Sequence, residues 1–432
     1  MRSTHRPRID PRRGLLALLG VLALLGVACE TAAPPPVTTA PRKPKAVPAA
    51  PACEPESSAA GQQAAEFDPL EGLELDLTAF GAAIDALGGS GRVDITTDAG
   101  GRPEFRSVTV AELGGTLDSE ASPVLAVEAS RRVRAGDLDA AGSAGAGDPF
   151  ASQQWSDAVT PYSPTWVCGR GEQVDIAVVD TGVDRTHPDL AGRTTTGGSS
   201  LGNAAQVVPG SGGVDPHGHG THVAGIAAAT ADNGVGIRGV APAARIVPVR
   251  VLDSSGAGWN ADVAAGITWA VDHGAEVINL SLGNTYQSQA VTNALTYADA
   301  AGVVVVAAAG NGGAGAPPHY PAADNRTIAV ASIDSDRSLS DFSTRGAYVD
   351  VAAPGAGILS TLPGDEYGYM SGTSMAAPFV SGTVALLLGN NPAASPAWVL
   401  QRITGRSDDA GPVGHDPGFG DGIVNPVRTL SN

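Results

Sequence analysis

The sequence is poor in basic residues, in aromatic residues and in cysteine. Lys and Arg together number 26 against 44 Asp and Glu, for a formal charge of −18, and aromatic residues make up 4% of the 432 positions. This balance predicts an acidic surface and argues against nucleic acid as a partner. Length alone predicts one main domain of roughly 250 to 300 residues with smaller parts beside it. The three cysteines are Cys29, Cys53 and Cys168.

The N-terminus lacks an apolar run long enough to span a bilayer comfortably. Five arginines precede a short apolar stretch from Leu15 to Ala28. This pattern predicts a secretory signal over residues 1–28, with an N-terminal anchor helix as the alternative. The stretch ends in Leu-Gly-Val-Ala-Cys29, which resembles a bacterial lipoprotein cleavage box in which Cys29 would carry the lipid, although its large aliphatic residue stands one place too far upstream. Plain cleavage after Ala28 is the other interpretation, and both place the mature protein outside the cell or at its surface.

Composition divides the rest of the chain. Residues 29–60 are rich in Pro, Ala and Thr, which favours an extended tether. Residues 61–136 contain patches with helix-like and strand-like spacing, which predict a small α+β unit. Residues 137–150, mostly Ala, Gly and Asp, predict an exposed, protease-accessible linker, and the main domain covers residues 151–432. The patches of the small unit are Leu70 to Leu87, Phe105 to Val110 and Pro123 to Val133.

The main domain alternates apolar strands with helical stretches. The strands show no polar alternation, as expected of parallel strands covered on both faces. This order predicts an α/β fold, a doubly wound and mostly parallel sheet with helices on both faces, whose active site lies at the C-terminal ends of the strands. The expected strands are Val174 to Val179, Arg245 to Leu252, Val277 to Leu282, Val303 to Ala308 and Thr327 to Ala331. The expected helices are His219 to Ala229, Ala261 to His273 and Gln289 to Ala301.

Three segments at strand ends or helix starts carry residues suited to nucleophilic catalysis. Asp180 ends a buried strand, His219 opens a helix within His-Gly-His-Gly-Thr-His222, and Ser374 stands in Gly-Thr-Ser-Met-Ala. Each has a plain structural interpretation when taken alone, a turn or cap for Asp180 and a helix N-cap for Ser374. The histidine spacing does not match the zinc helix motif, in which two ligands stand four apart around a Glu.

In the order Asp, His, Ser, these segments resemble the subtilisin-type serine proteases, or subtilases, over about Gln153 to Arg428. The segment Gly312 to Tyr320 is shorter than in the best-known subtilisins and is similar to that of the thermitase-type branch. The resemblance implies a serine endopeptidase that works through an acyl-enzyme intermediate. Its further landmarks are Ser281 to Gly283, Ala308 to Asn311, Tyr348 to Gly355 and Gly418 to Gly422.

The chemistry assigns a role to each matching residue. Ser374 is the expected nucleophile, His219 the general base, and Asp180 the carboxylate that orients and stabilises the imidazole. The resemblance implies that the side-chain amide of Asn311 and the backbone N–H of Ser374 form the oxyanion hole. A turn residue is the alternative for Asn311.

The resemblance also implies how a peptide substrate binds, by pairing with exposed strand backbone. The expected pocket walls are small and uncharged, which predicts a broad preference for apolar or uncharged residues before the scissile bond. Those walls are Ser281, Leu282 and Gly283 on one side and Ala308, Ala309 and Gly310 on the other. Because the segment Gly312 to Tyr320 is short, the sequence does not identify the far wall of the pocket.

A structural calcium ion (Ca²⁺) is a further implication of the resemblance. Many subtilases assemble such a site from carboxylate, amide and backbone oxygens, the ligands that calcium prefers. Solvated turn residues are the alternative. The matching positions are Asp189, Asp232, Asn233, Val235 and Ile237, with Gln153 or Gln154.

The segment before Asp148 fits an inhibitory propeptide, with a spacer or binding module as the alternative. The chain is then a zymogen whose own propeptide is an intramolecular inhibitor, and self-processing is expected between about Arg134 and Phe150. We further expect protein or peptide substrates, a monomer, and membrane attachment if Cys29 is lipidated. A disulfide between Cys53 and Cys168 would keep the prosegment attached after cleavage, with two isolated thiols as the alternative.

Two other classes compete with this interpretation. A lipase or esterase of the α/β-hydrolase type needs its serine in Gly-x-Ser-x-Gly with both partners downstream, and here both partners precede Ser374. A catalytically silent, surface-exposed binding protein on a subtilase fold is the second class. The intact set of Asp180, His219, Asn311 and Ser374 argues against it.

Overall fold

The protein is described by a computed structural model that covers residues 92–109, 112, 124–129, 132–134, 138–140, 148–202 and 207–431. The predicted signal, the tether, the expected helix Leu70 to Leu87 and the two cysteines Cys29 and Cys53 lie outside these residues. Cys168 is exposed and is bonded to no other described cysteine. None of the helices in the described ranges has the length and apolar character needed to cross a bilayer.

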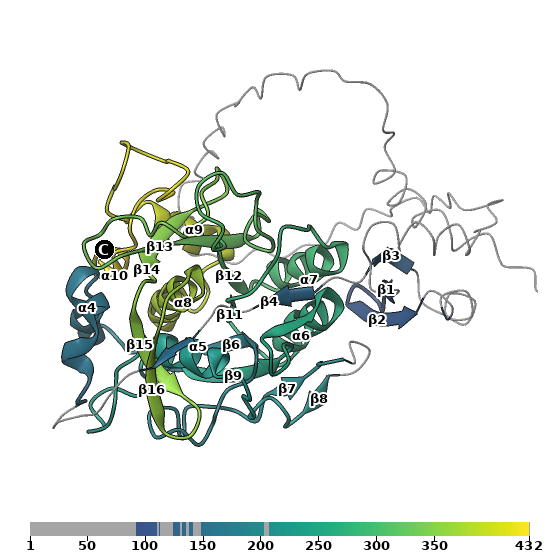
Figure 1. Ribbon diagram of the computed structural model, residues 1–432, viewed down its shortest axis with the longest axis horizontal. Helices are drawn as coiled ribbons and strands as arrows, with labels where there is room; N and C mark the ends of the chain where they lie inside the picture. Colours follow the sequence, from purple (N-terminus) through teal and green to yellow (C-terminus); the bar gives the residue numbers. More distant parts are fainter. Residues whose placement is uncertain are drawn as a thin grey trace, which may run out of the picture. The chain divides into compact units, whose positions relative to one another are not determined.

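An eight-stranded sheet forms the centre of the main domain (Figure 1). All neighbouring strands run parallel except the last pair, β7 and β8. The order across the sheet is β14 (Val351–Pro354), β13 (Thr327–Ile333), β12 (Val304–Ala308), β11 (Val277–Leu280), β6 (Asp175–Asp180), β9 (Arg245–Arg250), β7 (Gly198–Ser199) and β8 (Val208–Pro209). The predicted doubly wound α/β fold is confirmed, and the five expected strands are each within two residues of their predicted ends.

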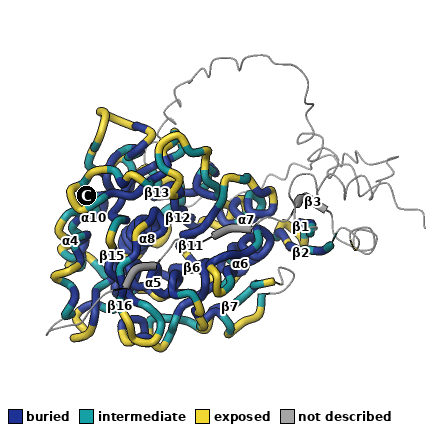
Figure 2. The backbone as a smooth tube through the Cα atoms, in the orientation of Figure 1, coloured by how far each residue is buried: buried dark blue, intermediate teal, exposed yellow. Residues whose placement is uncertain are grey.

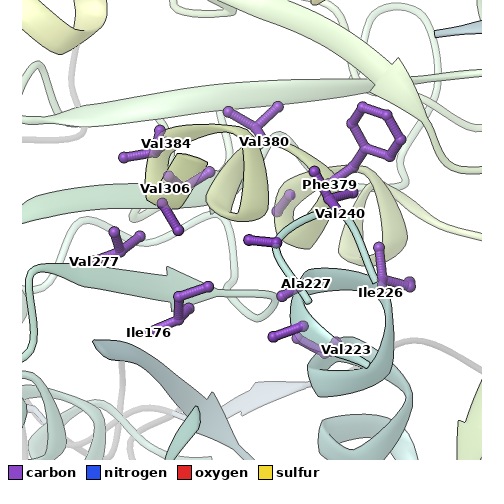
Figure 3. Close-up of a cluster of buried hydrophobic side chains, with 14 of the residues drawn as sticks. Ile176, Val223, Ile226, Ala227, Val240, Val277, Val306, Phe379, Val380 and Val384 are labelled. Atoms are coloured by element: carbon purple, nitrogen blue, oxygen red, sulfur yellow. The ribbon is translucent and has the colours of Figure 1, made fainter. Parts of the chain in front are cut away.

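Helices cover both faces of this sheet because successive strand residues point to opposite sides. On one face, Ile176 and Val178 of β6 join a core with the helices α5 (His219–Ala228) and α8 (Thr373–Asn390). Figure 3 shows part of this core, with Val223 of α5 close to Ile176. On the other face, Ala177 and Val179 pack with α6 (Asn260–Asp272) and α7 (Gln289–Ala300).

The central strands and α8 are buried almost throughout (Figure 2). Every residue of α8 from Thr373 to Leu388 is buried, so this helix runs through the domain interior. Full burial of each Val, Leu or Ile contributes about 1.5 to 3 kcal/mol, which makes these layers the main source of stability. The remaining helical elements are η2 (Ala151–Gln153), α4 (Trp155–Val159), η3 (Ser163–Val167), α9 (Pro396–Thr404) and α10 (Pro426–Leu430).

The segment before residue 148 contributes a small antiparallel sheet in the order β2 (Pro103–Thr109), β1 (Arg92–Asp98) and β3 (Val124–Ala129). Phe105 of β2 is 5% exposed and joins the apolar cluster of α6 and α7. At the rim of this contact, Arg102 donates to Asp272 at 2.6 Å, and Tyr297 donates to the other oxygen of Asp272 at 2.8 Å. The small unit therefore packs on the main domain with an apolar centre and a polar rim.

Two further strands of that segment pair with the main domain. β4 (Arg132–Arg134) runs antiparallel to β10 (Ala257–Trp259). β5 (Leu138–Ala140) runs antiparallel to β16 (Glu366–Met370), which forms a hairpin with β15 (Ile358–Leu362). The residues predicted as an exposed linker thus include one strand, β5, that adds to a sheet.

Candidate active site

Asp180 and His219 meet where β6 ends and α5 begins. Nδ1 of His219 lies 2.8 Å from Oδ1 and 2.9 Å from Oδ2 of Asp180, and both side chains are fully buried. Asp180 also accepts a bond from the backbone N–H of Thr181 at 2.7 Å. A carboxylate held in this way keeps the Nδ1–H tautomer and leaves Nε2 as the free acceptor. Within the described part of the chain, Nε2 of His219 has no hydrogen-bond partner.

Two glycines allow this close approach of strand end and helix. A Cβ on Gly220 would stand 2.0 Å from the carbonyl oxygen of Gly182 and 3.2 Å from Cβ of Asp180. No side chain fits there, so the Gly after His219 in the sequence motif is a packing requirement of the site. Gly182 itself has a φ of +108°, a conformation that favours glycine.

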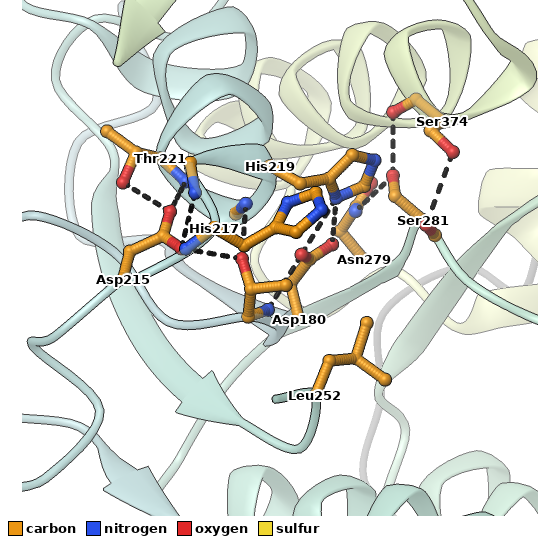
Figure 4. Close-up of polar contacts among 12 residues, drawn as sticks. Asp180, Asp215, His217, His219, Thr221, Leu252, Asn279, Ser281 and Ser374 are labelled. Atoms are coloured by element: carbon orange, nitrogen blue, oxygen red, sulfur yellow. Dashed lines mark hydrogen bonds and ion pairs between the residues drawn. The ribbon is translucent and has the colours of Figure 1, made fainter. Parts of the chain in front are cut away.

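Ser374 lies in the first turn of α8, next to Ser281 at the end of β11. The helix contains Pro378, which has no N–H to donate to the carbonyl of Ser374 four residues earlier. The hydroxyl of Ser281 takes that place and donates to the Ser374 carbonyl at 2.7 Å. In return, Oγ of Ser374 donates to the Ser281 carbonyl at 3.3 Å. In the view of Figure 4, the His219 ring lies between Asp180 and Ser374.

Asn279 extends this contact between β11 and α8. Its Nδ2 donates to Oγ of Ser281 at 2.9 Å, and its Oδ1 accepts from Ser381 of α8 at 2.9 Å. All three side chains are fully buried. Because each polar atom has a partner in a dry interior, the network fixes the position of the turn that carries Ser374.

Asn311 follows β12 and faces the same helix start. Its Oδ1 accepts from the N–H of Thr373 at 2.9 Å and from the Thr373 hydroxyl at 2.8 Å. These two bonds orient the amide so that Nδ2 faces Gly372, where a Cβ would be 3.2 Å away. The arrangement leaves an amide donor beside the turn that carries Ser374.

The pKa values of the two buried histidines of α5, His219 and His222, are shifted in opposite directions. Burial lowers the pKa of His219, but the adjacent Asp180 carboxylate and the nearby Asp215 outweigh it, so the pKa is raised overall. Burial lowers the pKa of His222 to about 3. His222 donates Nε2–H to the carbonyls of Ile358 and Gly368 at 3.0 and 3.1 Å, a structural role that keeps its ring neutral.

The expected pocket walls lie at the ends of the neighbouring strands β11 and β12, and the ring of His319 packs against both. Residues 284 and 320 form an antiparallel bridge, which places His319 beside Gly283. A Cβ on Gly283 would stand 2.4 Å from the His319 ring, and one on Gly310 would stand 2.7 Å from it. Nδ1 of His319 lies 3.3 Å from the Ala308 carbonyl. The ring thus contacts both expected walls, at a position that the sequence left unassigned.

A small hollow, partly open to solvent, is lined by Leu282 and by residues of α6 and α7. Its lining is mostly apolar, with Val263 of α6 and Leu295 of α7 opposite Leu282. Asn260 and Tyr320 supply polar groups at its wall. The sequence predicted Leu282 as a pocket residue but gave no indication of this second hollow, because its lining comes from four separate segments.

The loop expected to hold calcium packs against Asp189 and donates hydrogen bonds to its carboxylate. Its carboxylate, fully buried, accepts from Nδ2 of Asn233 at 2.9 Å and from the N–H of Ile237 at 2.9 Å. Burial raises the pKa of Asp189. Asp148, which the sequence reasoning missed, binds the backbone N–H groups of residues 232–234 from outside. The carboxylate of Asp232 instead pairs with Arg170 at 2.8 Å.

These residues fit an oxygen-binding cation in type, because the Asp189 carboxylate lies against a loop that carries the Asn233 amide and backbone carbonyls. Among the described residues, no three His, Cys, Asp or Glu side chains cluster closely enough to hold a metal ion by themselves. Backbone and amide oxygens would therefore have to complete the set. Gln154 is engaged elsewhere, with its amide bonded to the backbone N–H and carbonyl of Arg238.

Comparison with known proteins agrees with this geometry. The profile of the Subtilase family matches residues 171–422. Thermitase from Thermoactinomyces vulgaris is 49% identical over 249 residues, which cover 57% of this chain and 87% of thermitase. Subtilisin E from Bacillus subtilis is 35% identical over 352 residues, 81% of this chain and 88% of that protein.

A solved structure shows the same fold. Fervidolysin from Fervidobacterium pennivorans, a keratinolytic enzyme related to subtilisin, superimposes with a TM-score of 0.68 at 30% sequence identity. The match covers 79% of this chain and 61% of the fervidolysin chain. With the family profile spanning more than half of its length, this chain belongs to the subtilase family of serine proteases.

Proposed function

We propose that the protein is a secreted serine endopeptidase in which Ser374 is the nucleophile, His219 the general base and Asp180 the orienting carboxylate. The observation that carries the proposal is the buried Asp180–His219 pair, with both carboxylate oxygens within 2.9 Å of Nδ1 and with Nε2 unpartnered among the described atoms. A catalytically silent binding protein would have no need for a buried carboxylate–imidazole pair beside a helix-start serine.

The reaction begins when Oγ of Ser374 leaves the Ser281 carbonyl, rotates toward Nε2 of His219 and attacks the substrate carbonyl. His219 accepts the hydroxyl proton and passes it to the leaving amine, which gives an acyl-enzyme on Ser374. Water then enters with His219 again as base and releases the acid. Asp180 stabilises the imidazolium that forms in each half.

The oxyanion hole consists of Nδ2 of Asn311 and the N–H of Ser374. Support comes from the two bonds that fix the Asn311 amide with its nitrogen toward Gly372. One fixed hydrogen-bond donor in a dry site lowers the activation barrier by roughly 3 to 4 kcal/mol. The preorganisation of the two donors means that little reorientation is needed as charge develops.

The proposed primary specificity pocket lies between Ser281–Gly283 and Ala308–Gly310, with His319 at its end. Burial lowers the pKa of His319, while bonds to Ala308 and Gly283 oppose the shift only in part. A neutral ring between small walls favours an uncharged residue before the scissile bond, and its bulk favours a small one. The cavity beyond Leu282 would take an apolar side chain further from that bond.

The proposed propeptide role rests on the two strand pairings of the preceding segment. β10, paired with β4, lies close to Asp180, because Gly258 packs on the carbonyl of Val251, whose N–H donates to Asp180. β16, paired with β5, leads directly into the Ser374 turn. Both pairings bring the end of the preceding segment to elements next to the site, which supports self-cleavage between about Arg134 and Phe150.

Calcium, secretion and a lipid on Cys29 complete the proposal. Asp189, Asn233 and the backbone oxygens of Val235 and Ile237 would hold the ion, and Asp148 binds the backbone N–H groups of the same loop. The role of the calcium ion would be structural, since no step of the hydrolysis uses the ion. Protein or peptide substrates, export from the cell and a monomeric enzyme follow from the family and from the N-terminal pattern.

The test compares wild type with Ser374→Ala, both expressed as full chains in the same protease-deficient host. Wild type should hydrolyse a protein substrate and acquire a new N-terminus between about Arg134 and Phe150. Ser374→Ala should stay full length and inactive with a similar melting temperature, because only one hydroxyl is removed. Near-normal activity of the variant would rule out Ser374 as nucleophile, and equal processing of both chains would rule out self-cleavage.

A further inference from the structure

Asp215 is a buried carboxylate next to the site that the proposed mechanism does not use. It is 7% exposed and stands four residues before His219 in the loop that leads into α5. Its two oxygens accept five hydrogen bonds, a number that satisfies the carboxylate fully in a dry environment. The donors are the hydroxyl of Thr181, the N–H groups of His217, Gly218 and Thr221, and the hydroxyl of Thr221, at 2.6 to 3.1 Å.

Three of these bonds cap the helix that carries His219. The N-cap position of α5 is Gly218, which has no side chain to satisfy the free N–H groups at the helix start. Asp215 reaches over from the preceding loop and takes the N–H groups of Gly218 and Thr221, and that of His217 just before them. A carboxylate at this end also interacts favourably with the helix dipole.

The hydrogen bond from Thr181 joins this cap to the strand that carries Asp180. Thr181, the next residue after Asp180, donates its hydroxyl to Asp215 at 2.8 Å and accepts the N–H of Gly220 at 2.9 Å. Thr181 thus connects the end of β6 with both Asp215 and the first turn of α5. Figure 4 shows Asp215 on the far side of this junction from Ser374, bonded to Thr221.

We propose, resting on the proposed hydrolysis, that Asp215 is a positioning residue: its carboxylate fastens the end of β6 to the first turn of α5, and its charge stabilises the His219 imidazolium. The distance between Asp180 and His219 is set by how these two elements meet, and Asp215 holds the loop and the helix at that meeting point. A misplacement of about 1 Å in such a site costs about a hundredfold in rate.

The charge part of the proposal depends on all groups near the His219 ring. Asp180 and Asp215 are the carboxylates that favour the imidazolium. His222 follows on the same helix and stays neutral, and the ring of His217 stands edge-on with its centroid 6.2 Å from that of His219. Removing the Asp215 charge should therefore lower the pKa of His219 and move the acid limb of kcat/KM to lower pH.

The experiment compares purified, processed wild type with Asp215→Asn, Thr181→Val and Thr181→Ser. Asp215→Asn should fold, lose about tenfold to a hundredfold in kcat with little change in KM, and show the shifted acid limb. Thr181→Val breaks the link but keeps the charge, so kcat should fall while the acid limb stays in place. Thr181→Ser keeps the hydroxyl and should behave as wild type.

Asp175→Asn is the matched control. Asp175 is a buried carboxylate at the opposite end of β6, bonded to Arg245 by two 2.6 Å contacts. Its variant should lower the melting temperature but leave kcat and the acid limb unchanged. If Asp215→Asn is too unstable to purify, the Thr181→Val and Thr181→Ser pair decides the positioning role alone.

Suppose that wild type is active and that Asp215→Asn has the kcat and acid limb of wild type. This result would overturn the inference and leave the proposed function standing. So would equal losses of kcat in Asp175→Asn and Asp215→Asn, since both would then reflect general destabilisation. If the Asp215 variant cannot be purified, a Thr181→Val enzyme with wild-type kcat would overturn it as well. A wild-type chain without hydrolysis would overturn the proposed function itself, and this inference with it.

Discussion

Single side chains determine the shape of the proposed specificity pocket. Most of its wall residues are small, so the ring of His319 at its end has a large influence. The ring lies against both Gly283 and Gly310. A change at this residue alters the volume open to substrate without touching Asp180, His219 or Ser374.

We predict that His319→Ala enlarges the pocket and shifts preference toward large apolar residues. The ratio of kcat/KM for peptides with Phe before the scissile bond to that for peptides with Ala should rise by about tenfold or more, because each added methylene that fits contributes about 1 to 3 kcal/mol. The measurement is a set of peptides that differ only at this position. His415→Ala, on the exposed C-terminal loop, is the control, and an unchanged ratio in His319→Ala would disprove the assignment.

At the scale of elements, α5 contacts the β15–β16 hairpin through His222, whose ring donates to both strands. The unfolded chain binds a proton at this residue near pH 6.5, whereas the folded chain resists it until about pH 3. As pH falls through this interval, the unfolded state takes up a proton that the folded state does not. Stability contributed by the neutral ring is therefore present above about pH 6.5 and is lost as pH falls.

We predict that His222→Gln makes stability less dependent on pH between about 6.5 and 4. The variant keeps a side-chain N–H for the two carbonyls but has no group that titrates in this range. The measurement is melting temperature against pH in the Ser374→Ala background, which avoids self-digestion. Burial also lowers the pKa of His187, so some slope should remain. Equal slopes for His222→Gln and its parent would contradict the prediction, and His415→Gln provides an exposed control.

The elements that sequence predicted well are those buried on both faces. β6, β11 and β12 are mostly apolar runs, and α5 begins at the predicted His219. The short strands β7, β8 and β10 were missed because two or three residues with Gly or Pro have no periodic pattern. The β15–β16 hairpin was missed as well, although the sequence placed the Pro354 and Ser374 motifs on either side of it.

The same limit applies to the site. Asp180, His219, Asn311 and Ser374 were found because each stands in a distinctive local motif. Asp215 and His319 were missed because one contact that defines the role of each lies far away in the sequence, with Thr181 for Asp215 and with Gly283 for His319. Their roles depend on which strand ends and loops meet in space, and that information is not contained in any short segment.

At the scale of the whole molecule, the calcium proposal predicts a ligand-dependent stability. An ion that binds only the folded chain stabilises it by about 2.7 kcal/mol when its free concentration is about 100 times Kd. Chelation should therefore lower the melting temperature of the Ser374→Ala protein, and added calcium should restore it. Asp189→Asn should lose this response, whereas Asp175→Asn should retain it. Identical melting curves with chelator and with excess calcium would remove calcium from the proposal.

The central claim is that Ser374 is a nucleophile activated by His219, and covalent labelling tests it most directly. Wild-type enzyme should react with a fluorophosphonate probe, and mass spectrometry of the digested protein should place the single adduct on Ser374. His219→Ala, with the serine intact, should label far more slowly, because no base then accepts the hydroxyl proton. An adduct on another residue, or equal labelling of wild type and His219→Ala, would contradict the claim.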